Sequence, residues 1–202
     1  MNTMKNVVKV AVIVTVLLVG FSAQAQIFGI KAGAGISNIS SPDAFDNSRF
    51  GALFATKVAG TVEFEIVDET LFIGTGAGFA KRGASTIGDP LNLYYLEFPG
   101  GARYNVFNMG RSARFFLTSG FHIGVLALAT QSGETLQIGN GNAGDQLKPI
   151  DFNFNIGPGV IFDDRFELGL LTEFGIPDIA AFEGDTLRNI AVMVTFGFKF
   201  GQ

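Results

Sequence analysis

The single histidine of the chain, His122, is the first residue to test for chemistry. Hydrolysis by a serine nucleophile needs a histidine base within reach of the hydroxyl, and an acidic residue that orients the ring. Ser119 is three positions from His122, so in an extended strand the two side chains point to opposite faces. The candidate acid, Asp151, is expected opposite Ala127, several residues from His122. We therefore expect no catalytic residues and no enzyme activity.

A second set of polar residues has the charge balance of a filled interior. Each of these residues falls on the polar face of a segment in which apolar and polar residues alternate, and six are basic and six acidic: Lys31, Lys57, Glu63, Glu65, Arg82, Glu97, Arg103, Arg114, Asp151, Glu167, Glu173 and Lys199. Unpaired charges in a narrow interior are costly, so we expect ion pairs, with Glu167 near Lys199 across the last hairpin. The set is either a structural network, which we favour, or a path for ions.

Composition excludes several other chemistries. The absence of cysteine removes disulfides, thiol catalysis and cysteine-based zinc sites. The net charge is −4 and the chain has no basic run, so nucleic acid is not an expected partner. The loop around Gly141–Asp145 lacks the repeated acidic ligands of a calcium site. We expect no cofactor and no metal.

The first 25 residues read as a cleaved signal peptide. Lys5 and Lys9 precede an apolar stretch, residues 10–21, which is too short to span a bilayer as a helix. The sequence Ala23-Gln24-Ala25 then has the small-residue pattern of a cleavage site. The remaining residues, 26–202, form the expected single domain of an exported protein.

That domain shows the period of two that is typical of strands. Near the end, for example, Val192, Val194 and Phe196 alternate with Met193 and Thr195. The pattern predicts eight strands, at residues 27–38, 48–66, 71–83, 92–107, 113–128, 150–162, 166–178 and 187–200. The connections at 67–70, 108–112 and 163–165 are short, whereas those at 39–47, 84–91, 129–149 and 179–186 are longer. Short and long connections alternate, as in an eight-stranded antiparallel up-and-down transmembrane β-barrel of the outer membrane.

Two barrels fit this periodicity: one with its apolar face in lipid, and a soluble carrier with its apolar face inside. The position of glycine favours the barrel whose apolar face lies in lipid. Glycine is frequent on the polar face, where a narrow interior needs small residues and a solvated surface does not. Aromatic residues on the apolar face also gather near the short turns, as in the girdle at a bilayer interface. They are Phe28, Phe64, Tyr104, Phe115, Phe162, Phe166, Phe198 and Phe200.

Three short motifs resemble the PorT-type outer-membrane β-barrel family of Bacteroidetes. Residues 28–33 (Phe-Gly-Ile-Lys-Ala-Gly), followed by Ser37-Asn38, are similar to the opening strand of that family. Residues 94–99 (Tyr-Tyr-Leu-Glu-Phe-Pro) are similar to its fourth strand, and residues 81–84 (Lys-Arg-Gly-Ala) to the end of its third. The resemblance implies the barrel fold and location in the outer membrane of a Gram-negative bacterium. One member of the family assists protein secretion, a role that we do not transfer to this chain.

We therefore expect a monomeric barrel with a filled lumen that acts as a structural or surface-interaction protein. Its expected partners are outer-membrane lipid, the barrel-assembly machinery during insertion, and a protein or surface ligand at loops 39–47, 129–149 and 179–186. Three alternatives remain: a small porin-like channel, an accessory of protein secretion, and a lipid-modifying enzyme that would depend on His122.

Overall fold

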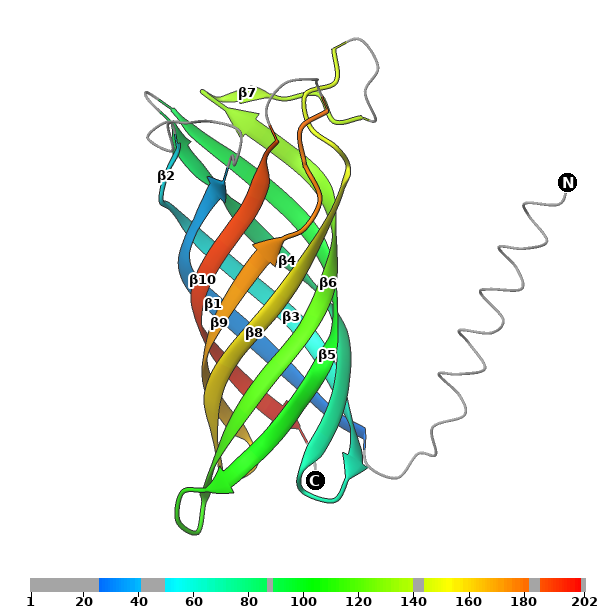
Figure 1. Cartoon of the computed structure of the whole chain (residues 1–202), viewed down its shortest axis with the longest axis vertical. Coiled ribbons are helices and arrows are strands. Elements are labelled where there is room, and N and C mark those ends of the chain that lie inside the picture. The colour runs from blue at the N-terminus through cyan, green and yellow to red at the C-terminus, as the bar shows by residue number, and fades with distance from the viewer. Residues whose placement is uncertain (1–25, 41–49, 87–88, 140–143, 182–185, 201–202) are drawn as a thin grey trace, which may run out of the picture.

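The computed structural model describes residues 26–40, 50–86, 89–139, 144–181 and 186–200, which form a closed antiparallel β-barrel (Figure 1). The eight long strands are β1 (Gln26–Ser40), β3 (Leu53–Val67), β4 (Leu71–Thr86), β5 (Pro90–Asn108), β6 (Ala113–Gln131), β8 (Ile150–Phe162), β9 (Phe166–Gly175) and β10 (Arg188–Phe200). Two short strands, β2 (Phe50–Gly51) and β7 (Glu134–Thr135), pair with β4 and β6. No helix in the described ranges is long and apolar enough to cross a membrane.

Each long strand pairs with its neighbours in the chain, and the first and last strands close the barrel. Partners of β1 on β10 run from Phe28 opposite Phe200 to Ser40 opposite Arg188. This topology confirms the predicted eight-stranded up-and-down barrel. The expected signal peptide (1–25) and parts of the expected loops (41–47, 140–143 and 182–185) lie outside the described residues.

Three predicted boundaries were wrong. The segment 84–91 is not a long loop, because β4 and β5 continue to the pair Ser85–Pro90 and only residues 87–89 connect them. The predicted strand 48–66 is interrupted at Ala52, so that β2 and β3 are separate. The last strand before the final loop, predicted to end at residue 178, ends at Gly175. Period-two alternation identifies strands but does not mark where backbone pairing stops.

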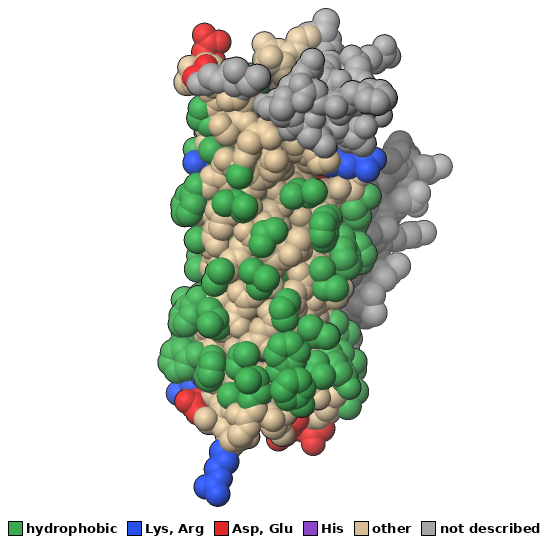
Figure 2. Space-filling model, turned by 60° about the vertical axis from the view of Figure 1, so that its left-hand side comes forward, with side chains coloured by type: hydrophobic (Ala, Val, Ile, Leu, Met, Phe, Trp, Pro, Cys, Tyr) green, Lys and Arg blue, Asp and Glu red, His purple; other side chains and the backbone are tan. Residues whose placement is uncertain are grey.

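The two faces of the wall differ as the alternation predicted. Large apolar side chains such as Phe54, Phe79 and Val194 point outward and are more than half exposed. Figure 2 shows such side chains along the height of one face of the barrel, with charged groups near its two ends. On the inner side, glycine allows the strands to approach closely: a Cβ atom built on Gly35 would lie 2.0 Å from the carbonyl oxygen of Val192. Small inward residues therefore let the wall close tightly.

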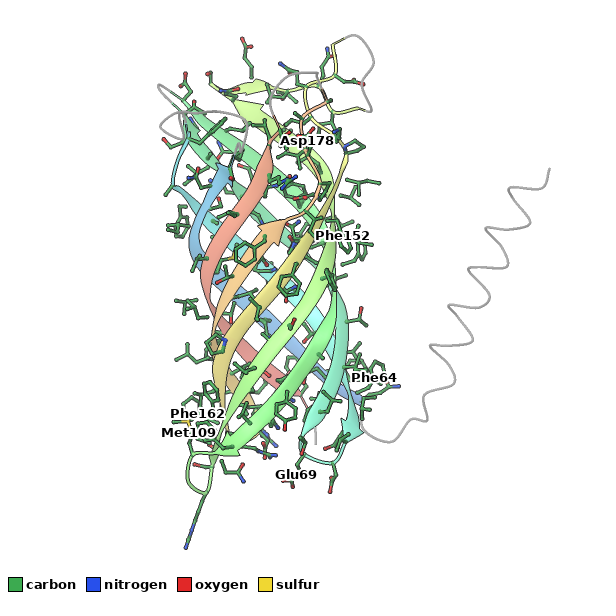
Figure 3. All side chains as sticks on the ribbon, viewed as in Figure 1. Phe64, Glu69, Met109, Phe152, Phe162 and Asp178 are labelled. Atoms are coloured by element: carbon green, nitrogen blue, oxygen red, sulfur yellow. The ribbon has the colours of Figure 1, made fainter. Side chains whose placement is uncertain are left out.

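The predicted aromatic side chains lie close together at the short-turn end. Phe198 stacks edge-on against Phe200 and also contacts Phe166, with ring centroids 5.1 Å apart in both pairs. On another part of the wall, Phe107 stacks with Phe115 at the same centroid distance of 5.1 Å. Figure 3 places Phe162 and Met109 at this end of the barrel, and Asp178 at the opposite end.

Candidate functional site

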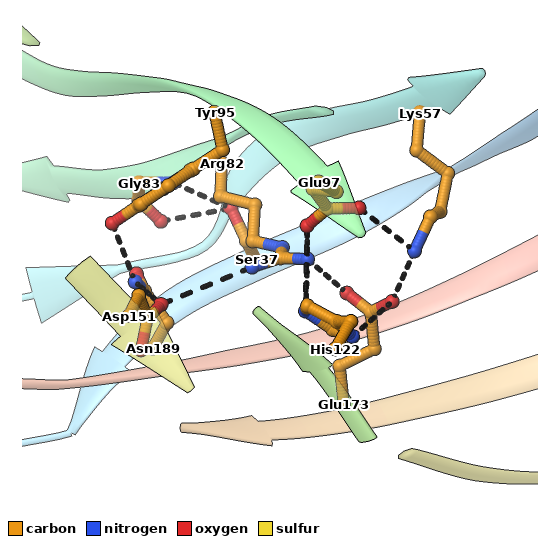
Figure 4. A network of polar contacts seen from close by, with 10 residues as sticks. All are labelled: Ser37, Lys57, Arg82, Gly83, Tyr95, Glu97, His122, Asp151, Glu173 and Asn189. Carbon is orange, nitrogen blue, oxygen red and sulfur yellow. Dashed lines mark hydrogen bonds and ion pairs between the residues drawn. The ribbon is translucent and has the colours of Figure 1, made fainter. Parts of the chain in front are cut away.

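The lumen contains two layers of charged side chains at different heights, and the first is centred on Arg82 of β4. We call this first set, Lys57, Arg82, Glu97, His122, Asp151 and Glu173, the upper layer (Figure 4). Nη2 of Arg82 pairs with Oε1 of Glu97 and lies 2.8 Å from Oε2 of Glu173. Nζ of Lys57 lies 3.1 Å from Glu97 and 2.5 Å from Glu173. Arg82 and Lys57 thus connect Glu97 of β5 with Glu173 of β9, and Arg82 also lies near Asp151 of β8.

His122 belongs to this layer and is 1% exposed. Its Nε2 lies 2.8 Å from Nη2 of Arg82 and 3.3 Å from Oε1 of Glu97. Because a guanidinium can only donate, Nε2 must accept this hydrogen bond, which assigns the ring proton to Nδ1. Ser119 lies on the outer face, opposite Ile156, so the predicted separation of His122 from Ser119 is confirmed.

The predicted position of Asp151 was wrong. It lies opposite Gly124, not Ala127. Paired residues in a sheet share a face, so the inward-facing Asp151 requires an inward-facing partner, and Ala127 is an extra, exposed residue in β6. The shift brings Asp151 to the upper layer, where its Oδ2 is 3.9 Å from Nη1 of Arg82 and accepts a hydrogen bond from Asn189.

Glu97, His122 and Glu173 have the donor types of a metal site. One ligand atom from each lies within 4.8 Å of the other two. Nη2 of Arg82 contacts all three side chains, however, so a metal ion at this position would have to displace a guanidinium. Lys57 adds a second positive charge beside the two carboxylates. The arrangement fits an internal ion-pair network better than a metal centre.

The second set lies nearer the short turns and connects five strands. This lower layer comprises Lys31, Glu63, Arg103, Glu167 and Lys199. Nζ of Lys199 is 2.6 Å from Glu63 and 2.9 Å from Glu167, the contact predicted across the last hairpin. Arg103 lies 2.9 Å from Glu63, and Lys31 lies 2.9 Å from Glu167. This layer has three cations and two carboxylates, the reverse of the upper layer, so the two layers together are balanced.

Two of the predicted lumen residues lie outside both layers. Arg114 pairs with Asp164 and lies 3.4 Å from Glu69, and an oxygen of Glu65 accepts a hydrogen bond from the backbone N–H of Glu69. Both side chains line a vestibule of about 690 Å³ at the short-turn end, beneath the lower layer. They stabilise the rim rather than fill the lumen.

The comparisons with known proteins agree with this geometry. A family model described as the outer membrane protein β-barrel domain matches residues 22–181. The chain belongs to this family of outer-membrane β-barrels. Among solved structures, Neisserial surface protein A is 12% identical with a TM-score of 0.54, and the alignment covers 86% of this chain and 97% of that one. The outer-membrane enzyme PagL is 13% identical with a TM-score of 0.56, covering 84% and 98%. No curated protein sequence matches the chain.

Outer-membrane β-barrels have short periplasmic turns and longer external loops, which assigns the two ends of this one. The turns after β3, β5 and β8 face the periplasm, and so does the vestibule. The connections after β1, β6 and β9 face outward, at the end where Figure 3 labels Asp178. The outer membrane is therefore the location that the family indicates.

Sequence reasoning missed an apolar cluster inside the external end. We call this set the external cluster: Ile39, Ala84, Leu91, Leu93, Tyr95, Leu126, Ala129, Leu147, Ile179, Ala180 and Leu187. Leu147 and Ala180 come from the connections after β7 and β9 and form an isolated bridge, so the described parts of these two loops fold into the mouth of the barrel. Tyr95 connects the cluster to the upper layer through Asn189, whose Nδ2 donates to the hydroxyl of Tyr95 at 2.9 Å and to Oδ2 of Asp151 at 2.8 Å. The sequence pattern that could have revealed the cluster is the alternation on β5, which turns Leu91, Leu93 and Tyr95 inward.

Proposed function

We propose that this outer-membrane barrel is a surface-interaction protein whose external loops meet a partner while its lumen serves as structural filling. The observation that carries the proposal is the continuous filling of the lumen above its centre. The upper layer crosses the lumen, and the external cluster covers it. Because residues of two external loops pack over the end of the lumen, they present a folded surface at the cell exterior.

Hydrogen bonds and an ion pair hold the described parts of two external loops. Lys148 pairs with Asp178 at 3.0 Å, and its N–H donates to the carbonyl of Ile179. The backbone N–H of Gln146 donates to Gln137, which ties the two arms of the same loop together. Loops that are fixed in this way bind a partner with a lower cost of ordering than flexible ones.

Site-specific photocrosslinking in intact cells tests the proposal. A benzoylphenylalanine residue at Gln137, which is exposed at the external end, should give adducts of higher mass on illumination. The same residue at Asp68, in a periplasmic turn, is the matched control for nonspecific capture. Equal adduct patterns at the two positions, or none at Gln137, would contradict a role at the external surface.

Conductance distinguishes this proposal from the channel alternative. In planar lipid bilayers the purified barrel should give no stable conductance steps, because ion pairs and apolar side chains occupy the lumen. Steps that change in size when Arg103 or Glu97 is replaced would establish a channel instead. Replacement of Arg114, which lies at the rim, is the comparison. If a pore exists, this substitution should change the entry of ions but should not block the pore.

The proposal keeps the finer predictions from the sequence. These are a cleaved signal peptide, membership of the PorT-type branch on the motifs at 28–38, 81–84 and 94–99, a monomeric state, and no catalytic role. Unchanged lipid A in cells carrying His122→Ala would agree with the absence of enzyme activity, whereas a lost modification would overturn it. Stranded secretion cargo after deletion of the gene would instead favour the secretion accessory.

A further inference from the structure

A small cavity separates the two charged layers. Its volume is about 120 Å³, and its wall includes the inward side chains of Ala59, Thr61, Phe116 and Thr118. An apolar cavity of roughly 150 Å³ in another protein holds benzene, so this one suits a single ring or a short chain. The cavity is bounded by charged groups that already have partners, such as Lys57 with Glu97. A neutral molecule with one hydrogen-bonding group is therefore its natural occupant.

Packed side chains stand between this cavity and both ends of the lumen. Towards the exterior lie the upper layer and the external cluster. Towards the periplasm, Arg103 lines both the cavity and the vestibule, and it is held between Glu63 and the ring of Phe72, 4.0 Å from the ring centroid. The barrel wall is the other boundary of the cavity, and Pro99 of β5 belongs to it.

The wall has a gap in its backbone pairing at the height of the cavity. Partners of β4 on β5 run up to Thr75 opposite Gly100 and resume at Gly78 opposite Glu97. The residues between them on β5 include Pro99, which has no N–H to donate to the neighbouring strand. Pro99 also lines the cavity, as do Thr75 and Gly100, so the cavity reaches the wall at this gap.

One side-chain hydrogen bond bridges the gap. Oγ1 of Thr75 donates to the carbonyl oxygen of Pro99 at 2.9 Å. On the outer surface beside it, Gly100 of β5 and Gly60 of β3 leave open space, since a Cβ built on either has no atom within 4 Å. The lipid-facing side of the gap is therefore uncovered.

A similar gap at Pro158 is more tightly closed. Pairing of β8 with β9 stops at Ile156 opposite Thr172 and resumes at Gly159 opposite Gly169. There, however, a Cβ built on Gly157 would lie 1.8 Å from the carbonyl oxygen of Leu170. The two backbones are thus in close contact, and the gap beside Pro99 is the better candidate for passage.

We propose that the seam between β4 and β5 at Pro99 admits small neutral amphipathic molecules from the bilayer into the central cavity. Molecules of this kind dissolve in the hydrocarbon region, which contacts the seam directly. Because Pro99 has no N–H, a brief separation of the strands breaks fewer backbone hydrogen bonds here than along a stretch of complete pairing, besides the side-chain bond from Thr75. The cavity then offers the hydroxyls of Thr61 and Thr118 beside the ring of Phe116.

A reversible cross-link across the seam tests this proposal. The register places Ala77 opposite Phe98, and both point outward. The carbonyl of Pro99 faces β4, so Ala77 and Phe98 occupy the adjacent non-hydrogen-bonded position, where Cα atoms lie about 4.5 Å apart, within the range for a disulfide. The chain has no cysteine of its own, so Ala77→Cys/Phe98→Cys can be oxidised and reduced without interference.

The probe is 4-fluorophenol, followed by fluorine NMR with the barrel in lipid nanodiscs. The unmodified protein should show a bound resonance that empty nanodiscs lack, and Ala59→Leu, which fills the cavity, should abolish it. Oxidation of Ala77→Cys/Phe98→Cys should slow exchange of the probe by roughly tenfold or more, because the strands can no longer separate. Reduction should restore the rate.

A second cross-link on the same hairpin is the matched control. Phe79→Cys/Leu96→Cys joins an outward pair within intact pairing, and its oxidation should leave exchange unchanged. Heat-modified migration in SDS gels verifies that each variant is folded. Absence of a bound resonance in the unmodified barrel would overturn the cavity as a binding site. Exchange that is equally fast with the oxidised seam would overturn lateral passage and point to the vestibule.

Discussion

At the scale of single residues, Arg82 has the greatest consequence. Its side chain is fully buried and contacts carboxylates from three strands as well as His122. Removal of one partner from a buried ion pair is far more harmful than replacement of the whole pair, because it leaves an uncompensated charge. The stability of the barrel should therefore depend on this residue more than on any exposed charge.

Replacement of Arg82 by methionine keeps much of the side-chain volume but leaves Glu97, Glu173 and Asp151 with fewer partners. We expect the free energy of unfolding to fall by about 3–5 kcal/mol. Urea titration in detergent micelles measures this change. Arg111→Met, in an exposed periplasmic turn, is the control and should change stability by no more than about 0.5 kcal/mol. Equal effects of the two substitutions would show that the upper layer is not a stabilising network.

His122 acts as an acceptor for Arg82, so its replacement should have a smaller effect. His122→Leu leaves one buried N–H of Arg82 without this partner, a cost of about 1–3 kcal/mol in unfolding free energy. His122→Gln can still accept through its side-chain oxygen and should recover part of the loss. A leucine variant as stable as the unmodified barrel would mean that Nε2 contributes nothing to holding Arg82.

At the scale of elements, the segment after β9 is fixed by Asp178. Its Oδ1 accepts hydrogen bonds from the N–H groups of Ala180 and Leu187, at 2.9 and 2.8 Å, and Oδ2 pairs with Lys148. Partial burial opposes ionisation, but the two backbone hydrogen bonds and Lys148 outweigh it and hold the pKa of Asp178 below its ordinary value. The external loops therefore depend on an ionised carboxylate.

The sign of the pH dependence follows from that lowered pKa. The stabilisation is complete above the ordinary carboxyl pKa of about 3.9 and is lost as the pH falls through the lower value of the folded state. The amide resonances of Ala180 and Leu187 in NMR spectra should move together over this acidic range. In Asp178→Asn neither should titrate. A midpoint above the ordinary carboxyl range would contradict the assignment.

At the scale of the whole molecule, closure of β1 against β10 turns a twisted sheet into a barrel without edges. Closure pairs Ile36 with Val192 and Ala34 with Val194, whose side chains are exposed on the apolar face. In lipid, every backbone polar group needs such a partner inside the protein. The barrel should therefore resist SDS until it is heated.

Gel migration of the outer-membrane fraction measures this resistance. Unboiled and boiled samples should migrate at different positions, because only heating opens the barrel. The soluble periplasmic fraction serves as the control and should contain none of the folded protein. Recovery of the protein from that fraction, with no shift on heating, would mean that the apolar face does not lie in lipid.

The sequence by itself determined the number of strands, which face of each points inward, and the balance of charge within. These properties are local, since the period of two is a property of the extended backbone and glycine is required wherever the interior is narrow. Lys199 and Glu167 could be placed together because both lie close to the short-turn end, Glu167 just after the turn at 163–165 and Lys199 near the end of the last strand. Only the tertiary structure decided the rest.

Register across a long loop is set by packing between strands, which is why Asp151 was misplaced. Extra residues at Ile66, Val106 and Ala127 also shift the alternation, so that Leu126 and Ala129 both point inward on one strand. The division of the charges into two layers depends on how far neighbouring strands are displaced along the barrel, and periodicity carries no information on that displacement. The external cluster depends on the same displacement, since it brings together residues far apart in the chain. The seam at Pro99 follows from the missing N–H of proline, but only the structure shows that the cavity reaches it.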